Sequence, residues 1–374
     1  MMNTTPSISF SGLLEQYQDV QEEIRAAIDR VLNSGWYILG REVENFEKEF
    51  AAYCGTKYAV GCASGTEAIA LSFMALGIKE GDEIITVPNT AVPTISALSM
   101  VGARPVFVDV DDCFLMDIKK IEKTITKRTK AIMPVHLYGQ MAEMEEIIAV
   151  AKRYDLEVVE DACQAHGAEY KGRRAGSLGT IGCFSFYPTK NLGCFGDGGA
   201  VTTNDKALHH KLMMLRNYGQ EKRYFHTIKG INSRLDELQA AILRVKLKYL
   251  DRWNKERQKI ALLYDRLLKD VCITPRQRNG CHHVFHLYVI RTRQREGLQL
   301  FLKENGIDTL IHYPVPVHLQ EAYKDLQYKQ GDFPSAEQLS GEILSLPMHP
   351  YLTEDNVSRI RNKICEYMKG VVQV

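Results

Sequence analysis

Two stretches, LEVVEDACQAH (156–166) and IGCFSFYPTK (181–190), indicate how this chain folds. Each begins with a short apolar run, which is typical of a buried strand. The first run ends on Asp161, and the second leads within a few residues to Lys190. In an open parallel sheet, ligands bind beyond the carboxyl ends of the strands, so both side chains are candidates for a functional site.

The same alternation extends over much of the chain. From Tyr58 onward, apolar runs and helical patterns follow one another, which is typical of a parallel sheet covered by helices on both faces. We therefore predict an α/β fold with a mostly parallel seven-stranded sheet between helices. The predicted strands are 58–62, 83–87, 105–110, 130–135, 156–161, 181–186 and 199–203.

A long amphipathic stretch follows from Arg234 to about Lys269, without a proline before Pro275. Its apolar residues recur at helical spacing, which predicts one long helix joining two parts of the chain. Beyond it, the pattern predicts a strand at 282–290 and further helices. We predict a large domain over 1–240, which includes N-terminal helices, and a smaller α+β domain over 241–374.

Composition excludes several classes of protein. The 374 residues are 45% hydrophobic and 25% charged, with a net charge of +1, so a disordered chain and a dedicated nucleic-acid binder are excluded. Prolines interrupt the most apolar stretch, 84–108, and residues 1–10 lack a signal pattern, so we expect no membrane segment. Nine cysteines without a C-x-x-C pair indicate a reducing cytoplasm and no zinc ribbon.

A histidine cluster at 281–286 superficially resembles a metal group. Its neighbours His282 and His283 point to opposite faces of a strand, and no second pair has zinc spacing, so we expect structural histidines and no metal.

The segment Ser64-Gly65-Thr66 lies between a predicted strand and a helix. Small residues at a helix N-terminus suit a phosphate, although an ordinary helix cap explains them as well. Asp161 and Lys190 also have ordinary explanations, as a surface cap and a solvated loop lysine. Together, however, the three features supply what pyridoxal phosphate requires: a phosphate cradle, an acid at the ring nitrogen and an amine for a Schiff base.

Five motifs carry a resemblance to a known family. In sequence order and over nearly the whole chain, they resemble the DegT/StrS sugar-nucleotide aminotransferases, which are fold type I pyridoxal phosphate enzymes. The motifs are ASGTEAI (63–69), VEDACQAHGA (159–168), FSFYPTKNLG (184–193), GDGGAV (196–201) and GINSRLDELQAAIL (230–243).

The resemblance implies roles for single residues. Lys190 would form the Schiff base and move the proton, Asp161 would pair with the ring nitrogen, and Gln164 would lie against the cofactor's O3′ atom. Asn232 would reach the phosphate from the partner subunit, so the resemblance implies a homodimer with shared active sites. The residues implied in holding the phosphate within the subunit are Gly65, Thr66 and Ser185.

The resemblance also implies weaker candidates for substrate contact, namely Arg234, His312, Tyr313 and His226. One position departs from the family: many relatives have an aromatic residue where VPNTAVPT (87–94) has Ala91, so the residue that stacks on the cofactor ring stays unassigned.

The predicted reaction moves an amino group from L-glutamate to a nucleotide-linked keto-deoxysugar. The form N-S-R-L at 232–235 resembles members that act on 3-keto sugars, so we expect a dTDP-3-keto-6-deoxyhexose to be aminated at C3. The alternatives are a 4-keto sugar aminotransferase and a non-catalytic regulatory protein on the same fold. A nucleotide-dependent oxidoreductase is disfavoured because G-x-G-x-x-G is missing after the first strand.

Overall fold

A computed structural model describes residues 7–372 of the chain. A seven-stranded sheet forms its centre, with the strand order β1-β9-β8-β5-β4-β2-β3. Strand β9 runs antiparallel to both of its neighbours, and the pairs from β8 to β3 are parallel, which confirms the predicted mostly parallel sheet. The strands are β1 (Tyr58–Cys62), β2 (Glu83–Thr86), β3 (Arg104–Phe107), β4 (Thr129–Ile132), β5 (Glu157–Asp161), β8 (Ile181–Ser185) and β9 (Gly199–Thr203).

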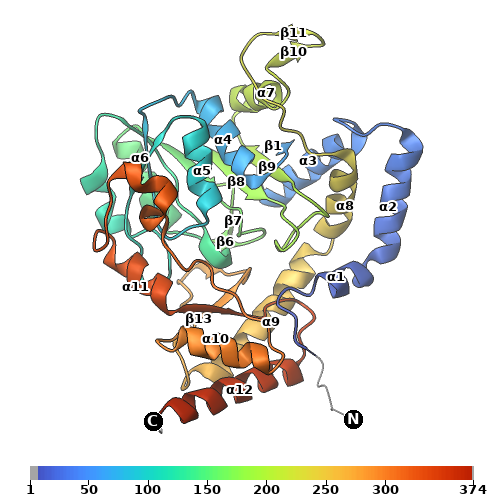
Figure 1. Cartoon of the computed structure of the whole chain (residues 1–374). Helices are drawn as coiled ribbons and strands as arrows, with labels where there is room; N and C mark the ends of the chain where they lie inside the picture. The colour runs from blue at the N-terminus through green and yellow to red at the C-terminus, as the bar shows by residue number, and fades with distance from the viewer. Residues whose placement is uncertain (1–6, 373–374) are drawn as a thin grey trace.

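Strand β8 shows that helices cover both faces of this sheet (Figure 1). The Sγ atom of Cys183 lies 3.2 Å from Ser72 Oγ in α4 (Gly65–Leu76). The next residue, Phe184, packs against Phe50 of α3 (Arg41–Cys54), with ring centroids 5.0 Å apart. Because successive side chains of a strand point to opposite faces, the sheet lies between these two helices.

Three more helices complete the layers around the sheet. Helices α5 (Val92–Met100) and α7 (Lys206–Leu215) pack against α4, and α6 (Met144–Arg153) packs against β4 and β5. The N-termini of α4 and α5 lie beside the carboxyl ends of β5 and β8.

Glu160 in β5 is a buried carboxylate in the middle of the sheet. His136 Nε2 lies 3.0 Å from one of its oxygens, and the backbone N–H groups of Gly176, Leu178 and Gly179 donate to it at 2.9, 2.8 and 2.7 Å. Burial acts to raise the pKa of Glu160, but these donors outweigh it, so that pKa lies below its usual value. The carboxylate therefore joins β5 to the loop that leads into β8.

The predicted long helix consists of two helices, α8 (Glu237–Leu247) and α9 (Leu250–Leu268). Both residues at the break contact Glu23 of α2 (Gln21–Ser34): Lys248 Nζ lies 2.9 Å from its carboxylate, and the Tyr249 hydroxyl donates to it. Helix α8 packs against α2 and α3, whereas α9 packs against α12 (Glu354–Val372). Tertiary contacts of this kind are invisible to helical periodicity.

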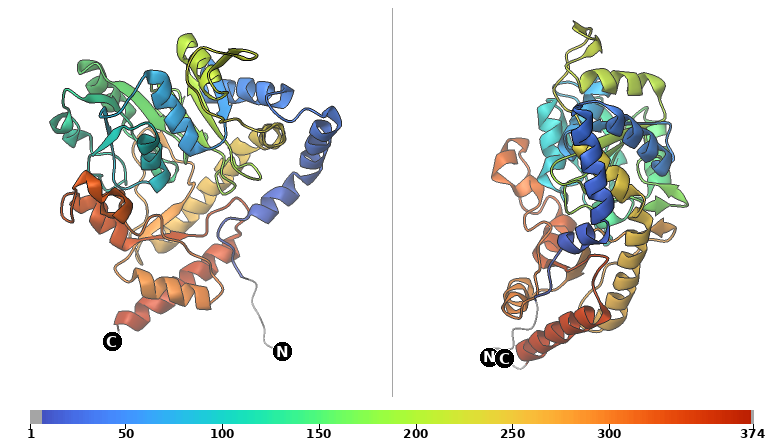
Figure 2. Two further views of the ribbon diagram at one scale, coloured as in Figure 1. Left: turned by 45° about the horizontal axis from the view of Figure 1, so that its top comes forward. Right: turned by 90° about the vertical axis from the view of Figure 1, so that its right-hand side faces the viewer.

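The C-terminal part contains the antiparallel pair β13 (Tyr288–Arg291) and β14 (Ile343–Leu346), with α10 (Arg295–Glu304) and α11 (Pro334–Glu342). Both views in Figure 2 place α10 and α12 at the opposite end of the molecule from the hairpin of β10 (Gln220–Lys222) and β11 (Phe225–His226). Tyr264, Tyr288 and Ile360 belong to an apolar cluster of this part. The division at residues 240 and 241 stays a prediction.

Within residues 7–372, no helix combines the length and apolar character that a membrane span requires. The same residues hold no group of three or more His, Cys, Asp and Glu side chains arranged for a metal ion. All nine cysteines lie in this range, and each carries a free thiol.

Glu237, at the start of α8, caps the N-terminus of α3. Its carboxylate accepts the backbone N–H groups of Gly40, Glu42 and Val43 at 2.8, 2.9 and 2.9 Å. These groups have no partner within their own helix, so a residue almost 200 positions away satisfies them.

We expect Glu237→Ala to lower the free energy of unfolding by about 2 kcal/mol, because three N–H groups lose a charged acceptor. Urea denaturation measures this change. The matched control is Glu44→Ala, which removes an exposed acid from the first turn of the capped helix α3. Its expected change in the free energy of unfolding is within about 0.5 kcal/mol. Equal losses in both variants would contradict the capping role.

Candidate active site

A cavity of about 450 Å³ lies at the carboxyl ends of β5 and β8. It brings together side chains from four separate motifs of the sequence, which confirms that the strand ends meet there. The predicted site residues that line it are Gly65, Thr66, Asp161, Gln164, Ser185, Lys190 and Tyr313.

One wall of the cavity is the N-terminus of α4. Ser64 caps this helix by accepting the backbone N–H of Glu67 at 3.2 Å. A Cβ atom on Gly65 would lie 2.5 Å from Ser185 Cβ and 2.9 Å from Cys163 Sγ, so only glycine allows the helix to approach β8 this closely. Backbone N–H groups and the positive end of the helix dipole therefore face the cavity, an arrangement that suits an anion.

Asp161 ends β5 and is almost completely buried. Thr94 Oγ1 donates to its Oδ2 atom at 2.8 Å, and the backbone N–H of Cys163 donates to its Oδ1 atom at 3.2 Å. Both oxygens thus have a partner, which the cost of burying a carboxylate requires. Each oxygen retains a lone pair for a cationic group in the cavity.

Lys190 follows β8 in a turn that its own N–H closes by donating to Tyr187 O at 2.9 Å. The side chain is half-buried and lines the cavity. Desolvation lowers the pKa of Lys190 below its usual value, although Cys163 and the negative charge of Asp161 act in the opposite direction. A larger fraction of this amine is consequently neutral at a given pH than of an exposed lysine.

Gln164 is held in place at both ends of its amide. Its Oε1 atom accepts the backbone N–H of Tyr138 at 2.8 Å, and its Nε2 atom donates to the Tyr313 hydroxyl at 3.2 Å. Burial raises the pKa of Tyr313 to about 12, so its hydroxyl stays protonated. The second hydrogen of Nε2 remains for a group in the cavity.

Four predicted residues lie outside this cavity. Asn232 is exposed, and Arg234 Nη1 donates to Asn217 Oδ1 at 3.1 Å. His226, in the β10–β11 hairpin, lies 2.9 Å through Nδ1 from Tyr218 O. His312 Nδ1 lies 2.9 Å from Ser345 Oγ, and burial together with Lys190 lowers the pKa of this imidazole to about 4. The substrate roles of Arg234, His226 and His312 stay predictions.

The cavity also contains side chains that the sequence did not single out. They come from the loop before α5 and its first turn, from the residues after β5, from the turn after β8 and from the loop before β9. A signal in the sequence exists for Cys163 and Tyr187, which closely follow β5 and β8, whereas Thr94 lies inside a helix and has no such local signal. These side chains are Thr90, Thr94, Cys163, Tyr187 and Asp197.

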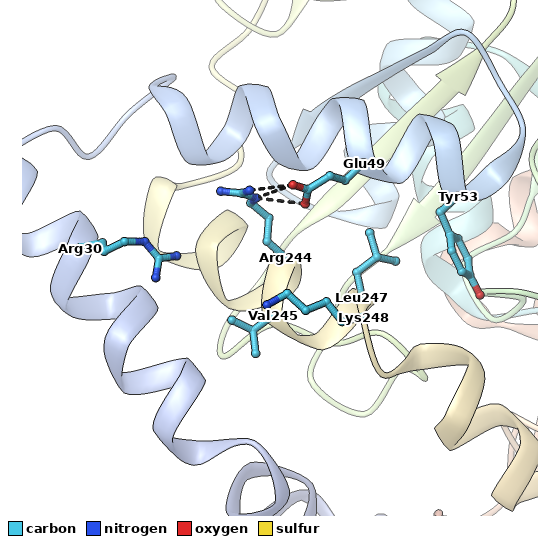
Figure 3. A pocket seen from close by; sticks show the side chains of 7 residues that line it. All are labelled: Arg30, Glu49, Tyr53, Arg244, Val245, Leu247 and Lys248. Carbon is cyan, nitrogen blue, oxygen red and sulfur yellow. Dashed lines mark hydrogen bonds and ion pairs between the residues drawn. The ribbon is translucent and has the colours of Figure 1, made fainter.

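A second cavity, of about 340 Å³, lies between α2, α3 and α8 and contains no predicted site residue (Figure 3). Its cations already have acidic partners: Arg244 Nη2 donates to Glu49 at 2.6 Å, and Arg30 Nε lies 3.5 Å from Glu42. We therefore place the chemistry at the strand-end cavity.

The sheet and its strand-end groups define an α/β enzyme of the fold type I aminotransferase class. The model of the DegT/DnrJ/EryC1/StrS aminotransferase family matches residues 18–365, and the chain belongs to this family.

Two curated relatives match nearly the whole chain. A dTDP-3-amino-3,6-dideoxy-alpha-D-galactopyranose transaminase from Aneurinibacillus thermoaerophilus is 50% identical over 362 residues, 96% of this chain and 99% of the relative. A protein from Geobacillus stearothermophilus named pleiotropic regulatory protein is 47% identical over 368 residues, 97% of this chain and 99% of the relative. Among solved structures, S. venezuelae DesV in complex with a ketimine intermediate has a TM-score of 0.95 and 46% identity, with 97% of this chain and 99% of that chain covered.

The lowered pKa of Lys190 predicts that its amine, in the ligand-free protein, is acetylated at lower pH than exposed lysines are. Competitive acetylation across a pH series, read by mass spectrometry, gives the midpoint. In Asp161→Asn the midpoint should fall further, because the negative charge that raises this pKa is gone. A midpoint equal to that of exposed lysines would contradict the buried placement of the amine.

Proposed function

We propose that the chain is a pyridoxal phosphate-dependent aminotransferase that moves an amino group from L-glutamate to a keto sugar linked to a nucleoside diphosphate. One observation carries this proposal: a desolvated lysine, a buried carboxylate and a helix N-terminus line one cavity. Membership of the aminotransferase family supports the same reaction.

The residues in the cavity fit the cofactor. Gly65 lets the N-terminus of α4 lie directly against Ser185, so the N–H groups of this helix and Ser185 line the same end of the cavity, where they suit a phosphate. Gly65, Thr66 and Ser185 would hold that phosphate, and Asp161 would accept the N–H of the pyridine ring. When bound, pyridoxal phosphate supplies an aldehyde carbon for amines and a ring that withdraws electrons.

Lys190 holds the cofactor through its amine before the reaction and is then free to move protons. With the cofactor bound, its Nζ atom would serve as the general base and acid that moves the proton of the amino-acid donor. The lowered pKa of Lys190 favours the neutral amine that accepts this proton.

Asp161 and Gln164 act by orientation. The Asp161 carboxylate would accept the N–H of the cofactor's ring and so favour the form of the ring that withdraws electrons. The Gln164 amide is held by Tyr138 and Tyr313, and its Nε2 atom would donate to the ring oxygen O3′ of the cofactor.

We further propose a homodimer in which Asn232 completes the neighbour's phosphate site. The adjacent Ser233 is buried, and its Oγ atom accepts the N–H of Ala63 in the same subunit at 3.3 Å. Asn232 is exposed and does not line its own cavity, so its side chain is available to another subunit.

For the acceptor, we propose a 3-keto-6-deoxyhexose carried by dTDP. The 50% identity to a dTDP-3-amino-3,6-dideoxyhexose transaminase and the N-S-R-L form at 232–235 support amination at C3. The basic residues Lys222, Arg223 and Lys229 in and after the exposed hairpin suit a diphosphate. A 4-keto acceptor stays the alternative for the same chemistry.

The substrate assignment predicts a product. With L-glutamate, the enzyme should convert the 3-keto sugar nucleotide to the 3-amino sugar, and the 4-keto isomer should react weakly or not at all; NMR of the product identifies the aminated carbon. Amination at C4 alone would overturn the assignment of the acceptor but would leave the proposed transaminase activity intact.

The name of the Geobacillus relative favours a second candidate, a regulatory protein without turnover. The two candidates differ in one spectrum: glutamate bleaches the yellow holoenzyme of a transaminase and leaves a non-catalytic protein yellow. Lys190→Ala serves as the inactive control.

Shared sites predict complementation. Mixing Lys190→Ala with Asn232→Ala should restore part of the activity, because each hybrid dimer has one site with both lesions and one with neither. A differently tagged pair of subunits verifies that exchange has occurred. Exchange without recovered activity would show that Asn232 serves its own subunit.

A further inference from the structure

Two threonine hydroxyls form a chain of hydrogen bonds that ends on the Asp161 carboxylate. Thr94 Oγ1 lies 2.8 Å from Asp161 Oδ2, and Thr90 Oγ1 lies 2.9 Å from Thr94 Oγ1. Thr90, Thr94 and Asp161 are 2%, 3% and 4% exposed, so these bonds lie in a buried wall of the cavity.

The directions of these bonds follow from proton counting. A carboxylate only accepts, so the single hydroxyl proton of Thr94 is donated to Asp161. Thr94 Oγ1 then accepts, and Thr90 is the donor between the two threonines. The pair forms a relay in which every proton points toward Asp161.

The relay comes from a rigid element. Pro93 stands in the first turn of α5, and the backbone N–H of Thr94 donates to Ala91 O at 3.0 Å, which sets the start of this helix. Because Thr94 is β-branched, its χ1 angle has few options in a helix. The hydroxyl is therefore already oriented before any ligand enters.

The threonine relay and the backbone donate to different oxygens of Asp161. The N–H of Cys163 donates to Oδ1, and Thr94 donates to Oδ2. Two donors on two oxygens prevent rotation of the carboxylate plane, and a hydroxyl proton stabilises its negative charge.

We propose that Thr94 is a positioning residue that keeps the Asp161 carboxylate aimed at the ring nitrogen of the cofactor, with Thr90 orienting the Thr94 hydroxyl. This inference rests on the proposed function. Thr94 acts through Asp161 and needs no contact with the cofactor of its own.

The test uses Thr94→Val, which removes the hydroxyl at nearly constant volume. Because one hydrogen bond to a charged group is lost, we expect pyridoxal phosphate to bind about tenfold more weakly and the half-reaction with L-glutamate to slow about tenfold. Thr94→Ser should restore both, and Thr90→Val should have a smaller effect. Ser99→Ala removes another hydroxyl of α5, one that donates to Ile95 O, and should change neither.

A cofactor analogue separates positioning from a general loss of structure. In this analogue a C–H group replaces the ring nitrogen, so Asp161 has no partner to hold. Wild type and Thr94→Val should bind the analogue equally. The loss of affinity in Thr94→Val arises at the contact between Asp161 and the ring nitrogen, and the analogue lacks this nitrogen. The absorption maximum of bound pyridoxal phosphate should differ between the two proteins and return in Thr94→Ser.

Two results would overturn the inference. One is an equal loss of affinity for pyridoxal phosphate and for the analogue in Thr94→Val, and the other is unchanged binding of pyridoxal phosphate in this variant. If the valine variant does not fold, Thr94→Ala takes its place with the same expectations. A wild-type protein that binds no pyridoxal phosphate would instead refute the proposed function, so the two failures are distinguishable.

Discussion

Two consecutive buried carboxylates, Glu160 and Asp161, set the arrangement at the centre of the sheet. Alternation along β5 sends them to opposite faces, and each requires hydrogen-bond donors because both are buried. Glu160 bonds to His136 and accepts three backbone N–H groups of the loop before β8, whereas Asp161 accepts a hydroxyl of α5. The elements that surround the cavity are thus tied to one strand end by the need to satisfy charge.

Close packing of backbone sets the shape of the cavity. At Gly65, helix α4 approaches β8 to a distance that no side chain would allow, and Gly199 likewise leaves no room for a Cβ atom beside Ser64 O. The proposed phosphate site would consequently rely on the helix dipole, peptide N–H groups and uncharged hydroxyls. Its charge-binding capacity does not depend on a titrating side chain.

Much of this could be predicted from the sequence, because buried strands and the residues just after them leave local patterns. The seven strands, Lys190 and Asp161 all belong to such patterns, and the structure places both residues in one cavity. Thr94 was missed because its partner is 67 positions away on another element. The break between α8 and α9 was missed for a similar reason, since contacts with Glu23 accompany it.

The hairpin of β10 and β11 stands apart from this machinery. Tyr224 and Phe225 are 77% and 69% exposed, and neither residue contributes to the wall around Lys190. The side chains of this hairpin thus lie apart from Lys190 and Asp161. On the proposed function, the hairpin therefore governs which nucleotide sugar is accepted, whereas Lys190 and Asp161 on the central sheet govern the transfer of the amino group.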